Sequence, residues 1–373
     1  MFAVKPAETA AQTEAPLFTV DFASISLEPF AALPAELWTE SFFRANELAN
    51  AYVDVRARDV VHAMSNTAGA IDPARRAPWE WIQRKLARRR GPLPPSQEFR
   101  QRLTAERPDL RAVVDLVDRA ADGYPSFFAG TVDGASILFD RAHPGLWDAY
   151  FSNSNPLYAA GNVLAAHAAA LSIEKSAGAL RVLEVGAGLG SAAEKLLEGM
   201  GPAIASYLLT DVSPGFLRKA RERLESGPRR EGAQLRFQLL DLGSPPGRWP
   251  APPGEFDLVF AVNVLHAVPD LIAALRGLRE RLAPGGSLVL GECVRPAPRH
   301  PVHPEFIFLL LEEFRGARLD PSTRPEAGFL DAGSWHASLG AAGFRSVQLI
   351  PDFPRAVAAY GEHSLAAIIA TAD

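Results

Sequence analysis

From about position 180 onward, short apolar runs alternate with stretches of helical periodicity, and this rhythm constrains the fold more than any other feature. The runs read ALRVLEV, ASYLLTD, QLRFQLL, FDLVFAV and GSLVLGE. Strands that alternate with helices form parallel sheets, and strands covered by helices on both faces are almost wholly apolar. We therefore expect five strands here and two more at Ser346–Ile350 and Leu365–Ala370, which makes an α/β sheet of seven strands.

Most of the first 130 residues show helical spacing instead. From Pro34 to Val53 the apolar residues recur at intervals of three and four, which predicts a helix with one buried face. Ser96 is a suitable cap for a second helix and Pro108 a suitable start for a third. Residues before position 30 are rich in Ala, Thr, Glu and Pro, so we expect a tail or an edge strand near Leu17–Val20.

This change of pattern predicts two domains, in agreement with a length of 373 residues. Residues 1–155 are expected to form a mostly helical substrate or lid domain, and residues 156–373 the α/β domain. Within the second domain, residues 295–343 form an insertion, expected to hold helices at Pro304–Phe314 and Ala332–Leu339. An insertion there lies beside the carboxyl ends of the strands, so we expect a lid over the ligand crevice.

Composition excludes several classes of protein. With 38 Lys and Arg against 43 Asp and Glu, the formal charge of -5 does not favour nucleic acid as a partner. The only cysteine, Cys293, excludes an internal disulfide and a zinc site built on paired cysteines. No apolar run reaches the ~18 residues that span a bilayer, and the N-terminus lacks an export signal, so we expect a cytoplasmic protein.

The segment LEVGAGLGS places three glycines at the end of the first parallel strand. Missing side chains there let backbone approach a ligand closely, although glycines at such a turn also permit tight packing alone. Asp211 ends the second strand, 21 residues after Gly190, where dinucleotide folds place the carboxylate that accepts ribose hydroxyls. Asp241 after the third strand and Glu184 before the glycines do not suit an anionic pyrophosphate. A cationic ligand would tolerate them.

With these motifs in this order, residues 160–373 resemble the class I S-adenosylmethionine-dependent methyltransferases. The resemblance implies a Rossmann-like methyltransferase sheet with S-adenosylmethionine as cofactor. It places the glycine loop against the methionine portion, Asp211 at the ribose and Asp241 at the adenine edge, although each acid alone also fits a helix cap or a solvated strand end. The implied cofactor-binding residues are Glu184, Gly186, Ala187, Gly188, Gly190, Asp211, Val212, Asp241, Leu242 and Asn263.

A histidine and a glutamate follow the fourth and fifth strands. FDLVFAVNVLHAV puts His266 just past the fourth strand, and GSLVLGEC puts Glu292 at the end of the fifth. Neighbouring strands lie about 4.8 Å apart, so these side chains can come within hydrogen-bond distance. A carboxylate that accepts from one imidazole nitrogen raises the basicity of the other. The pair is therefore predicted to act as a general base with its orienting group, unless the two are a solvated histidine and an ordinary strand-end acid.

At NVLHA the resemblance narrows to the C-methyltransferase domains of polyketide synthases, and it covers about residues 75–350. The segment LWDAYFSNSNPLYAAGNVLAAH also resembles those domains, which implies that Tyr150, Tyr158 and Asn162 line the substrate pocket. The implied substrate is a β-ketoacyl thioester on an acyl carrier protein. The catalytic histidine of such a domain removes the α-proton, and the resulting enolate attacks the sulfonium methyl.

Alternatives stay open at this stage. The chain could methylate oxygen or carbon of a free natural-product intermediate or α-keto acid, with a metal held by His300, His303 and Glu292, although histidines in a proline-rich loop are more simply exposed. The run Lys85–Arg90 is either a solvated helix face or a docking surface for an acidic carrier protein. A methyltransferase-like domain that only binds a partner also remains. The sequence leaves oligomeric state open, and it does not distinguish a stand-alone protein from a fragment of a longer one.

Overall fold

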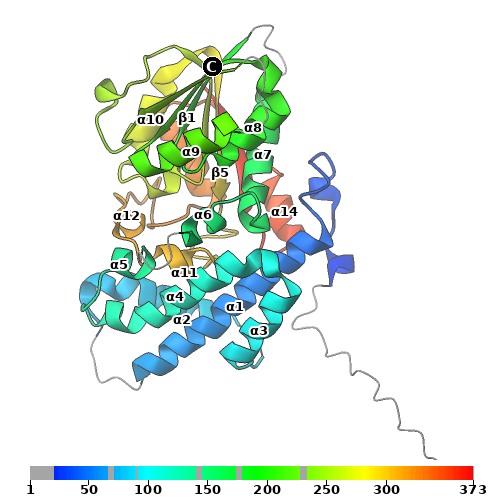
Figure 1. The fold of residues 1–373 in the computed structure, drawn as a ribbon, viewed down its shortest axis with the longest axis vertical. Helices are drawn as coiled ribbons and strands as arrows, with labels where there is room; N and C mark the ends of the chain where they lie inside the picture. Colours follow the sequence, from blue (N-terminus) through cyan, green and yellow to red (C-terminus); the bar gives the residue numbers. More distant parts are fainter. Residues whose placement is uncertain are drawn as a thin grey trace, which may run out of the picture.

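The computed structural model describes residues 21–65, 71–89, 91–139, 145–173, 179–226 and 233–372. Figure 1 shows two layers: the helices α1 to α4 lie below, and the β-sheet with its covering helices lies above. Several short helices, including α5, α6, α11 and α12, lie between the two layers. The predicted edge strand at Leu17–Val20 lies outside the described residues.

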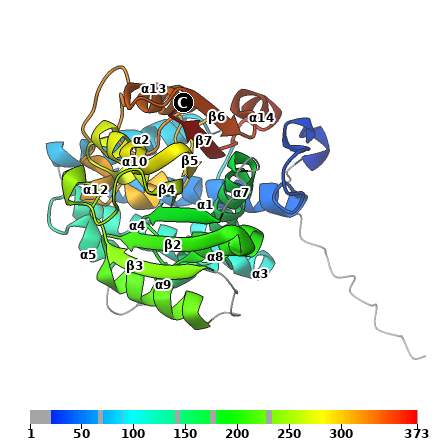
Figure 2. The same cartoon turned by 90° about the horizontal axis from the view of Figure 1, so that it is seen from above.

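The sheet has seven strands in the order β3-β2-β1-β4-β5-β7-β6, as Figure 2 shows from above. Its strands are β1 (Leu180–Val185), β2 (Ile204–Asp211), β3 (Gln234–Leu239), β4 (Phe256–Val262), β5 (Leu282–Cys293), β6 (Ser346–Ile350) and β7 (Leu365–Thr371). The first five are parallel, and β7 is antiparallel to both β5 and β6. The predicted seven-stranded α/β fold is confirmed. The expectation of strands covered on both faces fails for β3, because an edge strand is partly open to solvent.

Helices cover both faces of the sheet. On one face, α7 (Pro156–Ser172) and α8 (Ser191–Met200) contribute to a buried apolar cluster. On the other, α10 (Leu271–Arg281) and α13 (Ala332–Ala341) do so. The remaining helices of this half are α9 (Pro214–Ser226), which contacts β2 and β3, and α14 (Phe353–Ala359). The predicted helix at 332–339 corresponds to α13.

The N-terminal half is helical as predicted. Its helices are α1 (Glu40–Ser65), α2 (Arg76–Ala87), α3 (Ser96–Glu106), α4 (Arg111–Phe128), α5 (Gly134–Leu138) and α6 (Leu146–Tyr150). Ser96 is the first helical residue rather than the cap, because Pro95 holds the cap position and its φ of -57° is already suited to a helix start. A 3₁₀ turn, η4 (Pro108–Leu110), leads into α4. Other 3₁₀ turns are η1 (Phe22–Ser24), η2 (Glu28–Phe30), η3 (Pro73–Arg75), η5 (Gly201–Ala203), η6 (Pro246–Arg248) and η7 (Leu265–Ala267).

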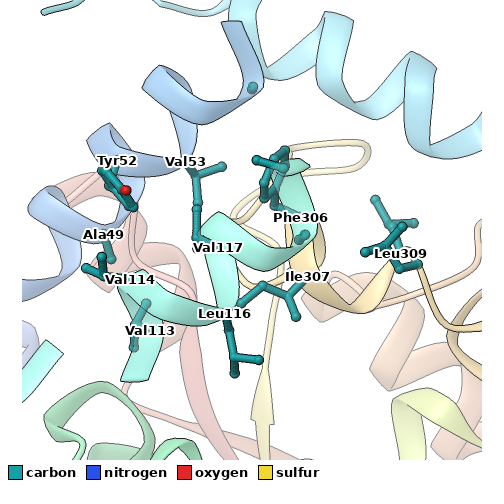
Figure 3. Close-up of a cluster of buried hydrophobic side chains, with 14 of the residues drawn as sticks. Ala49, Tyr52, Val53, Val113, Val114, Leu116, Val117, Phe306, Ile307 and Leu309 are labelled. Carbon is teal, nitrogen blue, oxygen red and sulfur yellow. The ribbon is translucent and has the colours of Figure 1, made fainter. Parts of the chain in front are cut away.

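The insertion after β5 shares its hydrophobic core with the N-terminal helices. Figure 3 shows Phe306 and Ile307 of the insertion beside Val117 and Leu116 of α4. Trp81 of α2 donates its indole N–H to the Glu305 carboxylate at 2.6 Å. The insertion is therefore part of the helical layer, although it belongs in sequence to the sheet half.

The single helix predicted at 304–314 is wrong. The chain forms two short helices, α11 (Glu305–Phe308) and α12 (Glu312–Arg315), with Leu311 extended between them at ψ 134°. The break changes the direction of the chain. Phe306 packs near Trp81 and Tyr124, whereas Phe314 packs against His266 at the end of the sheet.

Among the described residues, no helix is both long enough and apolar enough to cross a bilayer.

Candidate active site

His266 and Glu292 meet at the carboxyl ends of β4 and β5. His266 lies in η7, immediately after β4, and its Nδ1 is 2.7 Å from Glu292 Oε2. Glu292 is fully buried, and its Oε1 accepts the backbone N–H groups of Val264 and Leu265 at 3.2 and 3.0 Å. A carboxylate held in this way accepts the Nδ1 proton, which leaves the lone pair on Nε2. The arrangement can therefore present a basic nitrogen.

The insertion holds the turn that carries His266. Arg324 is almost fully buried and donates hydrogen bonds to the backbone carbonyls of His266 and Val268. The rings of Phe329 and Phe314 pack against the imidazole, with ring centroids 4.5 and 5.7 Å away. The orientation of the imidazole thus depends on residues that follow it by about 50 to 60 positions.

The chain bends sharply between β4 and η7. Asn263 has a φ of 55°, in the left-handed region where few residues except Gly, Asn and Asp are comfortable, and its N–H donates to the Gly291 carbonyl at 2.7 Å. A Cβ on Gly291 would lie 2.8 Å from the Ala165 side chain. Close packing of α7 on the sheet therefore requires glycine at this position.

A cavity of about 260 Å³ opens in front of the His266 ring. Its lining is mostly apolar and includes Phe308, Phe314, Phe329 and Leu365 together with polar residues from four parts of the chain: Asn263, Tyr150, Tyr158, His303 and Ser364. Apolar pockets with a few convergent polar groups are typical ligand sites. Tyr150 and Tyr158, two of the three residues predicted for the substrate pocket, line this cavity.

Asn162 is placed differently from the prediction. It is fully buried in α7, its amide donates to Asn153 Oδ1 at 2.8 Å, and it is not among the residues that line the cavity. The helical period explains the difference, because Tyr158 and Gly161 face the cavity and the next residue turns away from it.

The glycine loop after β1 has a left-handed backbone at three glycines and open space at one of them. Gly186, Gly188 and Gly190 have φ values of 67°, 54° and 75°, which favour glycine. A Cβ on Gly188 would meet nothing closer than a carbonyl oxygen at 4.0 Å, so space lies in front of the loop. Gly186 has a different role, because a Cβ there would be 2.3 Å from the Val264 side chain. Ala187 between them is buried.

Two buried carboxylates lie beside this loop. Asp211 accepts the N–H groups of Gly188 and Ser213 at 2.9 and 2.8 Å, and burial raises its pKa. Glu184 accepts the Tyr207 hydroxyl at 2.7 Å, and burial raises its pKa to about 8. Among the described residues, neither acid forms an ion pair.

This acidic environment fits a cationic ligand such as the sulfonium and ammonium groups of S-adenosylmethionine. The other predicted cofactor residues, Val212, Asp241 and Leu242, are exposed or half-buried at the ends of β2 and β3, where they remain accessible. Asn263 lines the cavity described above, and the side chain of the next residue, Val264, lies against Gly186 of the loop. Tyr158 also lines the cavity. It lies close enough to the glycine loop that the charges of Glu184 and Asp211, in addition to burial, raise its pKa.

The histidines considered as metal ligands are buried, so the expectation that they are solvent-exposed is wrong. His300 Nε2 contacts Glu362 Oε2 at 3.2 Å, whereas His303 lines the cavity. Across the part of the chain that the structure describes, no three His, Cys, Asp or Glu side chains are grouped to hold a metal ion.

Lys85 also departs from the expected solvated face. It is buried, and its Nζ donates to Asn50 Oδ1 at 2.9 Å and lies 3.6 Å from Asp54 Oδ1. Arg90, at the end of the predicted basic run, lies outside the described residues. Of the other arginines in this run, Arg88 is exposed and Arg89 is half-buried.

A family model described as "Methyltransferase domain" matches residues 183–288. The chain carries a methyltransferase domain. The matched segment includes the glycine loop, the acids after β2 and β3, and His266. Glu292 and the whole insertion lie beyond it.

The curated relatives of this methyltransferase domain include polyketide synthases of fungi. A highly reducing polyketide synthase of Aspergillus terreus is 32% identical over 252 residues, and one of Alternaria alternata is 31% identical over 273 residues. A non-reducing polyketide synthase of Macrophomina phaseolina is 33% identical over 261 residues. These alignments cover 64%, 70% and 67% of this chain, but the chain spans only 9%, 9% and 11% of those proteins.

Solved structures agree in fold over nearly the whole chain. The CurJ carbon methyltransferase has a TM-score of 0.71 at 23% identity and covers 92% of this chain and 95% of its own. The CMeT domain of the citrinin polyketide synthase has a TM-score of 0.69 at 19% identity, with coverage of 88% and 89%. The trans-methyltransferase CalH, solved with SAH, has a TM-score of 0.61 at 22% identity, with coverage of 87% and 88%. The chain therefore shares its fold, helical layer included, with these solved methyltransferase structures.

Sequence reasoning missed the residues that orient the His266 ring. Phe314, Phe329 and Arg324 come from the insertion, which shows no periodicity that relates it to η7. An arginine among prolines and acids, in RLDPSTRPEAG, gives no signal of burial.

Proposed function

We propose that this methyltransferase uses S-adenosylmethionine to methylate the α-carbon of a β-ketoacyl intermediate, carried as a thioester on an acyl carrier protein. The single observation that carries this proposal is the buried His266–Glu292 pair at 2.7 Å, whose histidine lines a mostly apolar cavity. The similarity to polyketide synthases supports the substrate class.

His266 is the general base in this proposal. The α-carbon of a β-ketoacyl thioester lies between two carbonyl groups, so its C–H bond is acidic enough for an imidazole to break. The proton moves to His266 Nε2, and the electron pair becomes an enolate. Glu292 holds the imidazolium through Nδ1–H, and Arg324 with Phe329 fixes the ring direction. S-adenosylmethionine supplies the electrophilic methyl group that the α-carbon accepts.

The glycine loop and the acids around it are proposed to bind the cofactor. Asp211 would accept the ribose hydroxyls, Glu184 would face the positive methionine portion, and Asp241 with Leu242 would border the adenine. Tyr158 and Asn263 lie at the junction with the cavity, where the methyl group must pass.

The experiment incubates the protein with labelled S-adenosylmethionine and a panel of β-ketoacyl carrier proteins, free β-keto acids and free α-keto acids. Mass spectrometry then shows which substrate gains a methyl group. Transfer to a carrier-bound β-ketoacyl chain is expected. Transfer to free acids alone would reject the carrier-bound substrate.

The role of His266 is tested by substitution. His266→Ala is expected to lose the ~10²- to 10⁴-fold that general-base catalysis supplies, whereas Glu292→Gln should lose less because the imidazole remains. The double variant should be little worse than His266→Ala, because residues acting as one unit are strongly non-additive. His336→Ala is the matched control, since this histidine is exposed on α13. Full turnover by His266→Ala would remove this histidine from the chemistry.

A further inference from the structure

A second histidine lines the same cavity. His303 lies in the insertion just before α11, and 7% of its surface is exposed. Its ring nitrogens have no hydrogen-bond or ion-pair partner among the described residues, in contrast to the paired rings of His266 and His300. Among the described residues, fully buried unpaired ring nitrogens occur at His167 and His363 but not at His303, so the His303 nitrogens are accessible from the cavity that this residue lines. A ligand in the cavity is the partner that this position offers.

The surroundings of His303 keep its ring neutral. Burial, followed by the nearby Lys85 ammonium, lowers its pKa to about 3, and Glu362 opposes this only weakly. Glu362 is already engaged with His300, and Lys85 with Asn50 and Asp54. A neutral imidazole has one N–H donor and one acceptor nitrogen. His303 thus offers the cavity a hydrogen-bond donor that carries no charge.

The two histidines therefore differ in chemical character. His266 donates its Nδ1–H to Glu292 and presents a basic nitrogen, whereas His303 has no carboxylate partner and is poorly suited to accept a proton. A neutral imidazole N–H can polarise a carbonyl group, and a fixed donor of this kind stabilises the oxyanion that develops.

We infer that His303 donates a hydrogen bond to a carbonyl oxygen of the substrate and stabilises the enolate that His266 generates. This inference rests on the proposed function. The α-C–H bond breaks, the proton goes to His266 Nε2, and the electron pair spreads onto the carbonyl oxygen. The His303 proton stays on its nitrogen throughout. His303 is then a second catalytic residue, supplied by the insertion.

The hydroxyls of Tyr150 and Tyr158 are the competing donors. Both line the cavity, and neither hydroxyl has a hydrogen-bond partner among the described residues. Tyr158 is close to the acids of the glycine loop and Tyr150 to Cys293. The corresponding Tyr→Phe variants therefore belong in the same experiment, as a measure of how much each donor contributes.

The test follows exchange of the α-hydrogen of acetoacetyl-N-acetylcysteamine in deuterated water, with S-adenosylhomocysteine present so that no methyl transfer occurs. His303→Phe keeps a ring of similar size but removes the donor. Removing one oxyanion donor typically costs about 10²- to 10³-fold in rate, and we expect a loss of that order. His303→Asn and His303→Gln place an amide N–H near one or the other ring nitrogen, and at least one should recover part of the rate.

A second measurement tests directly whether His303 stabilises the enolate oxygen. Enolisation of bound acetylacetone is followed by its ultraviolet absorbance as pH is raised; loss of the donor should move the midpoint to higher pH in His303→Phe. Circular dichroism and S-adenosylhomocysteine affinity verify that each variant is folded. Unchanged exchange in His303→Phe, or amide variants no better than Phe, would overturn the role of His303. If His266→Ala still loses exchange in that case, the proposed function stands; if it exchanges normally, the proposed base itself is wrong.

Discussion

If Glu184 faces the positive portion of the cofactor, as proposed, cofactor affinity should rise with pH, because the carboxyl must then be ionised. Burial raises the pKa of this carboxyl to about 8, so most of it is protonated at pH 7 in the cofactor-free protein. If the cofactor binds the ionised form alone, the competent fraction is about 9% at pH 7 and about 90% at pH 9. Affinity should therefore increase about tenfold between these values, and binding at pH 7 should release nearly one proton.

Calorimetric titration with S-adenosylmethionine in two buffers of different ionisation enthalpy measures both quantities. Glu184→Gln is the matched variant, since its amide oxygen can still accept the Tyr207 hydroxyl. It should show neither proton release nor the rise in affinity. If cofactor affinity rises with pH equally in the wild type and in Glu184→Gln, Glu184 is not the titrating group. If the rise is then lost in Asp211→Asn, the titrating group is Asp211, whose pKa is also raised.

The raised pKa of Glu184 also makes the free energy of unfolding depend on pH. A carboxyl with a raised pKa binds more protons in the folded state than in the unfolded state, so unfolding free energy falls as pH rises from about 4.5 to about 8. The slope contributed by Glu184 is at most about 1.4 kcal/mol per pH unit. Urea unfolding of the cofactor-free protein should show this loss, and Glu184→Gln should reduce it.

Three further outcomes are expected. Asp211→Ala should weaken cofactor binding at least about tenfold in the same calorimetric assay without unfolding the protein, because hydrogen bonds to a charged acceptor contribute roughly 1.5 to 3 kcal/mol each; unchanged affinity would mean that the adenosine lies elsewhere. Glu305→Ala should lower the urea-unfolding free energy by about 1 to 3 kcal/mol, because it removes the acceptor of the buried Trp81 indole N–H and one of the two carboxylates paired with Arg295, the other being Glu326. Glu312→Ala on the exposed face of α12 should change it by less than about 0.5 kcal/mol. Dialysis against a chelator should leave turnover intact, and activity lost and then restored by a divalent ion would favour a metal-assisted reaction.

The sheet was predictable because its signals are local. Each strand is a short apolar run between turn signals, and the order of strands and helices determines that the ends of β4 and β5 are neighbours. The approach of His266 to Glu292 follows from that adjacency alone, across 26 positions of sequence. The glycine loop and Asp211 are predictable for the same reason, since each lies at a strand end.

The insertion was not predictable, because its structure depends on partners far away in sequence. His300, His303 and Lys85 are polar, and polar residues are exposed by default unless a partner is known. His300 contacts Glu362, which is 62 positions away, and Lys85 contacts Asn50, which is 35 positions away. The break at Leu311 likewise serves two packing surfaces that periodicity within the segment does not encode.

During translation, the N-terminal helices of the helical layer are synthesised long before the insertion that they pack against. Trp81 donates a hydrogen bond to Glu305, which is synthesised 224 residues later. Tyr124 donates one to the carbonyl of Phe306, which is synthesised 182 residues later. At ~5–20 residues per second, translation leaves the apolar surface of α2 and α4 without its final partner for roughly 10 to 45 s. Contacts of such long sequence separation slow folding and prolong exposure to aggregation. Yield in a cell should therefore depend on chaperone capacity more than the protein's final stability would suggest, and a chain that ends before residue 302 should aggregate rather than accumulate as a free helical unit.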